Sequence, residues 1–169
     1  ELAKKSGWTN IMGVEPSSEA IEYANPDIKT KILNSIFEVD NYNEDYFDLV
    51  FVAMLIEHVP DINKFLSDIY KILKPGGKIL VVSFHSLEDR IVKYFFTHYS
   101  KNQSRPSRYL PEKNDNSVAL FDEYKNIILK PTKKEINQNS RSRSAKLRYA
   151  IRSKNKFSYP NELINKFRK

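Results

Sequence analysis

The sequence predicts an α/β protein built on a parallel sheet, and three features support this. Short β-like runs alternate with helical patterns through the first half of the chain, which is typical of βαβ units. The run FDLVFVAML, residues 47–55, is almost continuously apolar, as expected for a strand buried on both faces. The chain has 169 residues and 40% hydrophobic content, enough for one domain with its own core.

The expected elements of the first half follow in order. The runs NIMGVE (10–15) and TKILNSIF (30–37) are strand candidates, and SSEAIEYA (17–24) is a helix candidate with Ser17 or Ser18 as its N-cap. Asp61 caps a further helix, which KPGG (74–77) ends. The run KILVVSF (78–84) is the next strand. The apolar residues of the helix before KPGG recur at helical spacing, namely Ile62, Phe65, Leu66, Ile69 and Leu73.

In the second half we expect Ser86 to begin a helix of capping-box type, Ser-x-x-Asp, that reaches Asp89. Residues 100–117 are rich in Ser, Asn and Pro and indicate a loop, and ALFDEYKNIIL (119–129) is a short amphipathic piece. Apolar and basic residues alternate over 145–152, which predicts a half-exposed strand that completes the sheet. With no sign of a second core, we expect one domain over 1–157 and a basic tail at 158–169.

Composition excludes several classes of protein. The chain has no cysteine and only three histidines, so we expect neither a disulfide framework nor a metal site. No apolar run approaches the roughly 20 residues that span a bilayer. The first residues, ELAKKSGW, lack a signal-peptide pattern. We therefore expect a soluble, cytoplasmic protein without a membrane partner.

Charge divides the chain into two halves. Residues 1–74 carry 7 Lys and Arg against 13 Asp and Glu, and residues 75–169 carry 21 against 8. A strongly basic half favours a polyanionic partner, most simply nucleic acid. The alternative is a basic surface that serves solubility alone.

Ligands of open parallel sheets bind at the carboxyl ends of the strands, so the side chains that follow these ends are candidates for a site. Glu15 follows the first strand and can accept hydrogen bonds from the hydroxyls of a nucleoside ribose, or it is simply an exposed loop carboxylate. Ser35, Ile36 and Phe37 follow the second strand, where they can bound a purine ring or pack in the core. Ala53 lies near the end of the third strand, before Glu57 and His58, and we expect His58 to be a structural hydrogen bonder.

The fourth strand ends in the polar stretch SFHSLEDR, residues 83–90. Ser83, His85, Ser86 and Glu88 are candidates for positioning a base, and Arg90 is a candidate for contact with RNA. The local alternative is that Ser86 is an N-cap and that Glu88 and Asp89 serve the helix dipole.

The run from Arg141 to Lys156 has seven Lys and Arg and no acid. Tyr149 and Phe157 are interleaved with it, a combination that suits phosphate contacts and base stacking. The candidate RNA-binding residues here are Arg141, Arg143, Lys146 and Arg148. A solvated strand face is the alternative.

Two segments of the chain resemble known protein families. The stretch IMGVEPSSEAIEYA, followed by the run from FDLVFVAML to KPGGKILV, resembles class I S-adenosylmethionine-dependent methyltransferases of the type 11 group, over residues 1–82. This resemblance implies a Rossmann-like sheet with helices on both faces and S-adenosylmethionine bound near Glu15, Ser35, Ile36, Phe37 and Ala53. The glycine-rich loop after the family's first strand is absent, so we expect the sheet to lack that strand.

SFHSLEDR, with the distant KPTKKEI and SRSRSAKLRYA, resembles the bacterial 16S ribosomal RNA cytosine-N4 methyltransferases, the MraW family, over residues 75–157. The two resemblances meet at residues 74–77, which marks a candidate seam. Together they imply methyl transfer to N4 of a cytosine in small-subunit ribosomal RNA, with Ser83, His85 and Ser86 at the reaction. The alternatives are a small-molecule methyltransferase and a non-catalytic RNA-binding fragment.

Overall fold

The computed structural model describes residues 6–53, 58–100, 119–122 and 124–156. The chain forms two compact units, Glu1–Asn41 and Tyr42–Lys169, and each is described by itself. Glu57, most of the predicted loop at 100–117 and the basic tail at 158–169 lie outside the described residues. The expectations of a single domain over 1–157 and of a missing first strand stay predictions.

The first unit contains a small parallel sheet and two short helices. Strands β1 (Gly13–Val14) and β2 (Ile32–Leu33) pair in parallel, with Gly13 opposite Ile32. Between them lie α2 (Ser18–Glu22) and α3 (Pro26–Lys29), and a 3-10 turn, η1 (Val39–Asn41), follows. The predicted order of strand, helix and strand is confirmed, and both strands are shorter than the apolar runs that predicted them. Ser17, one of the two residues predicted, is the N-cap of α2.

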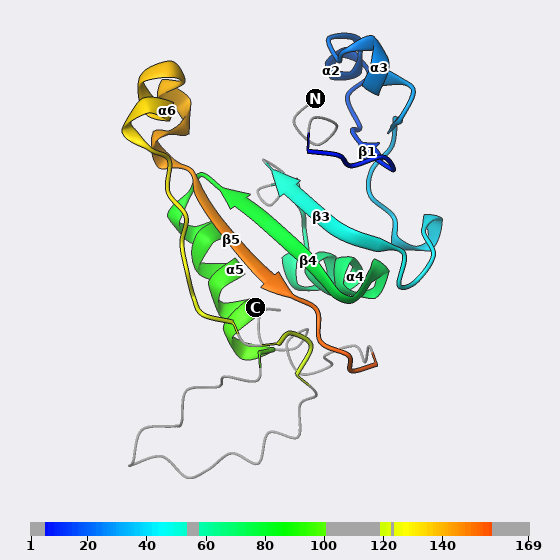
Figure 1. The fold of residues 1–169 in the computed structure, drawn as a ribbon, viewed down its shortest axis with the longest axis vertical. Helices are drawn as coiled ribbons and strands as arrows, with labels where there is room; N and C mark the ends of the chain where they lie inside the picture. Colours follow the sequence, from blue (N-terminus) through cyan, green and yellow to red (C-terminus); the bar gives the residue numbers. More distant parts are fainter. Residues whose placement is uncertain (1–5, 54–57, 101–118, 123, 157–169) are drawn as a thin grey trace. The chain divides into compact units, whose positions relative to one another are not determined.

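The second unit contains a three-stranded sheet in the order β3-β4-β5 (Figure 1). Strand β3 (Phe47–Ala53) is parallel to β4 (Leu73–Ser83), and α4 (Ile62–Ile72) connects them. Helix α5 (Ser86–His98) follows β4 directly, and α6 (Lys133–Gln138) and η3 (Ser140–Ser144) precede β5 (Lys146–Ile151). Strand β5 is antiparallel to β4, so the predicted basic strand does complete the sheet.

The core of the second unit lies between one face of this sheet and the helices α4 and α5. The rings of Phe95 and Phe96 on α5 and of Tyr70 on α4 all contact Phe121 edge to face. The strands contribute the alternate residues that point to this face: Val52, Ile79, Val81 and Ala150. Both helices cover the same face, so the described residues of this unit provide no helical cover for the other face. Burial of β3 on both faces was a wrong expectation, because Phe51 is 58% exposed.

The KPGG segment belongs to β4 rather than to a turn before it. The strand begins at Leu73, directly after α4, and the pairing with β3 shifts register between Phe47 and Leu49. A Cβ atom on Gly77 would lie 2.8 Å from the carbonyl oxygen of Lys74 and 3.1 Å from that of Phe47. The glycine therefore lets the strand bulge while its backbone stays close to β3.

Candidate functional site

The turn between β4 and α5 carries the SFHS residues predicted to meet a substrate. His85, not Ser86, is the N-cap of α5, and its Nδ1 accepts a hydrogen bond from the backbone N–H of Leu87 (3.3 Å). Glu88, not Asp89, completes the capping box, because its carboxylate accepts from the backbone N–H groups of Phe84 and His85. The expectation of Ser86 as the cap was wrong, since Ser86 is already the first residue of the helix.

The three predicted catalytic residues differ in their access to solvent. Ser83 is 2% exposed and points to the core face of the sheet, opposite Lys146 of β5, so its position favours a role inside the fold. His85 and Ser86 are exposed at the end of the strand. Because Nδ1 of His85 accepts a hydrogen bond, a neutral ring carries its proton on Nε2. The turn thus offers one ring N–H donor and one hydroxyl to a ligand.

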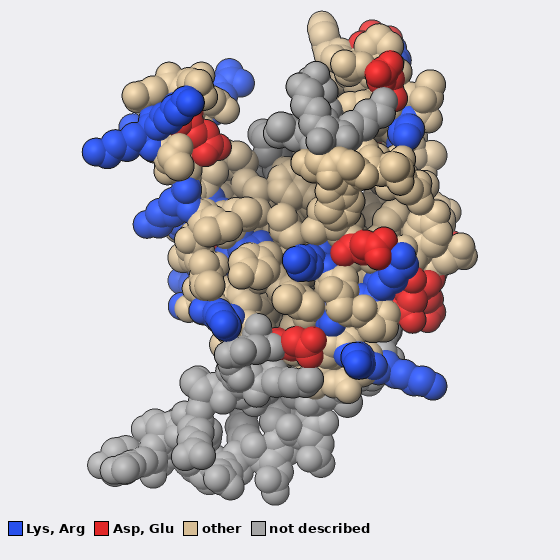
Figure 2. Space-filling view, viewed as in Figure 1, with Lys and Arg blue, Asp and Glu red and all other residues tan. Residues whose placement is uncertain are grey.

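The basic run reaches the same end of the sheet. Antiparallel pairing places Lys146, the first residue of β5, beside Ser83, the last residue of β4. The η3 turn, which carries Arg141 and Arg143, comes immediately before β5, and both arginines are exposed. Figure 2 shows Lys and Arg side chains along the side of this unit that carries α6 and β5. The predicted RNA-binding residue Arg90 is also exposed, in the first half of α5.

A buried ion pair joins the two motif segments. The Nε of Arg148 on β5 donates to one carboxylate oxygen of Asp89 on α5 (2.6 Å), and its Nη2 donates to the other (3.1 Å). Lys146 donates to the same carboxylate at 3.4 Å. A bidentate pair of this kind fixes both distance and angle between helix and strand. SFHSLEDR and SRSRSAKLR, far apart in the sequence, are therefore parts of one structure.

The pKa values of this cluster follow from the ion pair. Burial by itself would raise the pKa of Asp89, but the hydrogen bonds and charge of Arg148, with those of Lys146, outweigh it and lower that pKa. Burial raises the pKa of Tyr124, more than the adjacent Arg148 lowers it. The pair is ionised at neutral pH.

The structure places Arg148 in a role that differs from the predicted phosphate contact. The residue is 2% exposed, and its remaining Nη1 donates to the Tyr124 hydroxyl (2.9 Å) and to Oδ1 of Asn126 (2.8 Å). Since every nitrogen of the guanidinium is engaged, Arg148 does not belong to the RNA-binding surface. Sequence reasoning gave Asp89 only a role at the start of the helix and did not assign Tyr124 or Asn126. The alternation along β5, which puts Arg148 on the same face as Ala150, is a signal that the arginine is buried but does not identify its partners.

In the first unit, Glu15 lies directly after β1 and is half-buried. Its Oε1 accepts from the backbone N–H of Ser17 (2.9 Å), and no described residue bonds the other oxygen. Nδ2 of Asn34, which follows β2, donates to the backbone oxygens of Glu15 and Pro16. The ends of the two strands are thus tied together with one carboxylate oxygen available to a ligand, which fits the predicted ribose contact.

The other predicted cofactor residues occupy different environments. Ile36 is 65% exposed, and Phe37 beside it is half-buried. The Ser35 hydroxyl donates to the backbone oxygen of Ile36 (3.0 Å). In the second unit, Ala53 is exposed at the last position of β3, and His58 is exposed beyond it. The exposed Ile36 is available to pack against an apolar ring.

No metal-binding group of His, Cys, Asp and Glu occurs among the described residues. Among the described helices, none is long and apolar enough to cross a bilayer.

The fold is similar to that of a solved S-adenosylmethionine-dependent methyltransferase from Mesorhizobium loti. The two structures superpose with a TM-score of 0.51 at 17% sequence identity, over 89% of this chain and 84% of that one. The likeness assigns the chain to the Rossmann-like methyltransferase fold.

The sequence then identifies the family. The family model of the MraW methylases matches residues 13–153, so the chain belongs to the MraW methylase family. The ribosomal RNA small subunit methyltransferase H of Buchnera aphidicola subsp. Schizaphis graminum is 37% identical over 153 residues, which are 82% of this chain and 49% of that protein. The protein of the same name from Bartonella quintana is 52% identical over 82 residues, 48% of this chain and 24% of that protein.

The chain therefore spans between about a quarter and a half of the curated relatives that it matches. The matched residues, 13–153, include residues 74–77, where the two resemblances meet, and the seam there stays a prediction. The family model thus covers residues of both halves of the sequence.

Proposed function

We propose that this protein is an S-adenosylmethionine-dependent methyltransferase that modifies N4 of a cytosine in small-subunit ribosomal RNA. The observation that carries the proposal is the pairing of β4 with β5, which brings the exposed His85 and Ser86 to the same end of the sheet as the basic η3 turn. Membership of the MraW methylase family and the names of its relatives support the same activity. As an enzyme of ribosomal RNA, it works in the cytoplasm.

In this proposal the residues of the first unit hold the cofactor. The free carboxylate oxygen of Glu15 accepts hydrogen bonds from ribose hydroxyls, and Ile36 packs against the adenine ring. Ser35 and Phe37 remain proposed neighbours of the cofactor, and the role of Ala53, in the second unit, stays a prediction. When bound, S-adenosylmethionine supplies an electrophilic methyl group that a nitrogen nucleophile takes by in-line displacement, a reaction governed by placement.

The SFHS turn positions the base. Nε2–H of His85 donates to an acceptor on the cytosine ring, and the Ser86 hydroxyl accepts from the exocyclic amine as positive charge develops on it. The amine releases a proton when its new N–C bond forms, and the exposed turn lets water accept that proton. Ser83 supports the turn from the core.

Arg90, Arg141, Arg143 and Lys146 bind the phosphates of the RNA. Lys146 is half-buried and forms an ion pair with Asp89, so the exposed arginines provide most of the attraction for the phosphates. The target base must leave the base stack before it can be methylated, so single-stranded or loop RNA is the preferred substrate.

The test is methylation of small ribosomal subunits that lack the modification, followed by nuclease digestion and mass spectrometry of the nucleosides. We expect N4-methylcytidine from the wild type, a large loss of rate in His85→Ala, and no loss in Lys93→Ala, which alters an exposed residue of the same helix. Methylation of a small molecule alone would favour the type 11 alternative. RNA binding without cofactor binding would indicate a non-catalytic fragment.

A further inference from the structure

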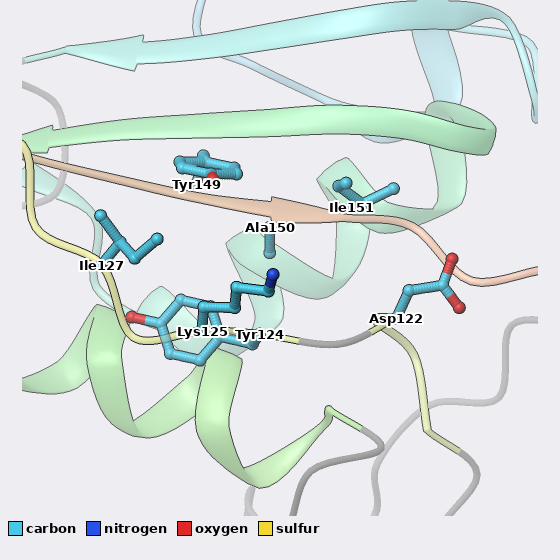
Figure 3. Close-up of a pocket in the computed structure, with 7 residues that line it drawn as sticks. All are labelled: Asp122, Tyr124, Lys125, Ile127, Tyr149, Ala150 and Ile151. Atoms are coloured by element: carbon cyan, nitrogen blue, oxygen red, sulfur yellow. The ribbon is translucent and has the colours of Figure 1, made fainter.

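A pocket of about 320 Å³ opens at the outer edge of β5, away from the SFHS turn (Figure 3). Tyr149 and Ile151 of β5 form one side, and Tyr124, Lys125 and Ile127 of the adjacent segment form the other. Tyr149 pairs with Leu80, three residues before Ser83, so the pocket lies about 10 Å along the strand from the turn. The methylation site described above does not include it.

The pocket exists because the described residues between Asp122 and Leu129 leave the strand between two fixed points. At one end, the backbone N–H of Asp122 donates to the Ile151 oxygen (2.9 Å). At the other end, Leu129 and Leu147 exchange two backbone hydrogen bonds of 3.0 and 2.9 Å. The backbone of Tyr149, midway between Leu147 and Ile151, points to the same edge. No described residue bonds its outward N–H or C=O, so both groups face the pocket.

The wall opposite β5 is held in place by the buried ion pair. Nη1 of Arg148 binds the Tyr124 hydroxyl and the side chain of Asn126, and Asn126 has a positive φ of 52° that turns the segment outward. Asparagine tolerates this left-handed conformation better than most residues. The segment is therefore preorganised and does not close onto the strand.

The lining suits a nucleotide. The main-chain N–H and C=O of Tyr149 offer a donor and an acceptor side by side, the pattern that the edge of a nucleobase presents in complement. The side chain of Ile127 and the ring of Tyr149 supply apolar surface for the base. Lys125 is exposed and forms no ion pair with a described residue, so its ammonium is available to a phosphate. In Figure 3, Asp122 lies at the end near Ile151, where it disfavours phosphate.

We propose that this pocket binds one nucleotide of single-stranded RNA, a neighbour of the methylated cytidine, through the backbone of Tyr149 and the ammonium of Lys125. The inference rests on the proposed function and adds a subsite to it. A peptide that extends the sheet is a poorer fit. Strand addition needs unpaired groups on successive alternate residues, whereas Leu147 and Ile151 are already bonded on either side of Tyr149.

The direct test is nuclear magnetic resonance on the ¹⁵N-labelled full chain. Titration with cytidine, uridine, adenosine or guanosine 5′-monophosphate should shift the amide signal of Tyr149, and at least one nucleotide should saturate it. A signal that responds to an extended peptide and to none of the nucleotides overturns the proposal.

Matched variants test the subsite in RNA binding. Lys125→Glu should weaken binding of a 12-nucleotide single-stranded RNA roughly tenfold, as loss of a charge-assisted contact predicts. Lys130→Glu, an equal charge change outside the pocket, should have a smaller effect. Ile127→Trp should fill the pocket and weaken binding, and Ile128→Trp, next to it in the sequence, should not.

Two further measurements separate this proposal from the proposed function. S-adenosylmethionine affinity, measured by calorimetry, should be the same in all four variants. Suppose that the wild type methylates ribosomal RNA while Lys125→Glu and Ile127→Trp bind RNA as tightly as the wild type does. In that case the subsite is wrong and the proposed function stands. If the wild type neither binds nor methylates RNA, both are wrong.

Discussion

At the scale of single residues, the ionic cluster around Asp89 decides how the predicted site is assembled. Asp89 and Arg148 are 8% and 2% exposed, and they join α5 to β5 across 59 residues of sequence. An ion pair this deep is costly to break from one side, because the remaining charge stays buried without a partner. Asp89 and Arg148 therefore each need the other in order to stay buried. The position of the SFHS turn depends on this ion pair, because the pair joins α5 to β5.

Removing either partner should destabilise the second unit. We expect Arg148→Met and Asp89→Asn each to lower the free energy of unfolding by about 3 kcal/mol, and the double variant to lose much less than the sum. Urea unfolding followed by circular dichroism measures this. Arg143→Met, at an exposed position, is the control and should stay within about 0.5 kcal/mol. An Arg148→Met protein as stable as the control would contradict the structural role.

The same pair predicts a dependence on pH. The pKa of Asp89 is lower in the folded than in the unfolded chain, where it is about 3.9. Its contribution to stability is therefore complete above the unfolded pKa and is lost as the pH falls through the lower folded value. The stability difference between wild type and Asp89→Asn should be constant from about pH 7 to 5 and shrink below about pH 4. A stability difference that grows on acidification would show that the direction of the pKa shift of Asp89 is wrong.

Glu15 provides a residue-scale test of the cofactor site. Glu15→Ala should weaken S-adenosylmethionine binding by about tenfold or more, because hydrogen bonds to a carboxylate are lost. Glu19→Ala, an exposed acid on α2, is the matched control. Isothermal titration calorimetry measures both. Equal affinities in the two variants would remove Glu15 from the site.

At the scale of elements, β4 does more than the sequence pattern indicates. It begins directly at the end of α4, bulges at Gly76 and Gly77, pairs with β3 and β5, and delivers the SFHS turn. The two glycines meet different constraints. Gly76 has a φ of +82° with open space around it, whereas Gly77 is crowded by backbone oxygens of the same strand and of β3.

Substitutions at the two glycines should therefore differ in cost. Gly77→Ala forces backbone atoms apart and should lower the free energy of unfolding by about 2 kcal/mol or more. In Gly76→Ala the only unfavourable factor is the left-handed backbone conformation, so the free energy of unfolding should fall by about 1 kcal/mol. Thermal unfolding of both variants checks the order. If Gly77→Ala were the milder change, the close approach of β4 to β3 would be wrong.

At the scale of the whole molecule, charge is organised around the proposed RNA substrate. Residues 75–169 carry the excess of Lys and Arg, and the antiparallel β5 brings the exposed Arg141 and Arg143 to the end of the sheet where the SFHS turn lies. By contrast, Lys71 and Lys74 lie near the start of β4 and pair with Glu44 and Asp48.

This arrangement predicts which charges bind RNA. Replacing Arg141 and Arg143 together with Ala should weaken binding to single-stranded RNA. It should also lower the slope of log K against log salt by about 1.4, since each lost phosphate contact removes about 0.7. The Lys71→Ala and Lys74→Ala pair changes net charge equally and is the control. Fluorescence anisotropy over a range of salt concentrations measures both slopes. Equal slopes for the two variants would exclude a localised contact.

Local sequence patterns determined much of this protein. Apolar runs and helical spacing located the strands and helices, because periodicity of 2 or 3.6 residues reflects which side of an element is buried. The alternation over 145–152 correctly predicted the closing strand. The SFHSLEDR and SRSRSAKLR segments indicated the family that the comparison then established.

Only the tertiary structure decided how the charged side chains are used. Alternation along β5 puts Arg148 on the same face as Ala150, but only the fold shows that Asp89, Tyr124 and Asn126 surround its guanidinium. His85 became the helix cap because Glu88 completes the box, and the pocket beside Tyr149 formed because a distant segment leaves β5. Each outcome depends on a partner that folding brings close, and no local periodicity encodes which partner a charge will meet.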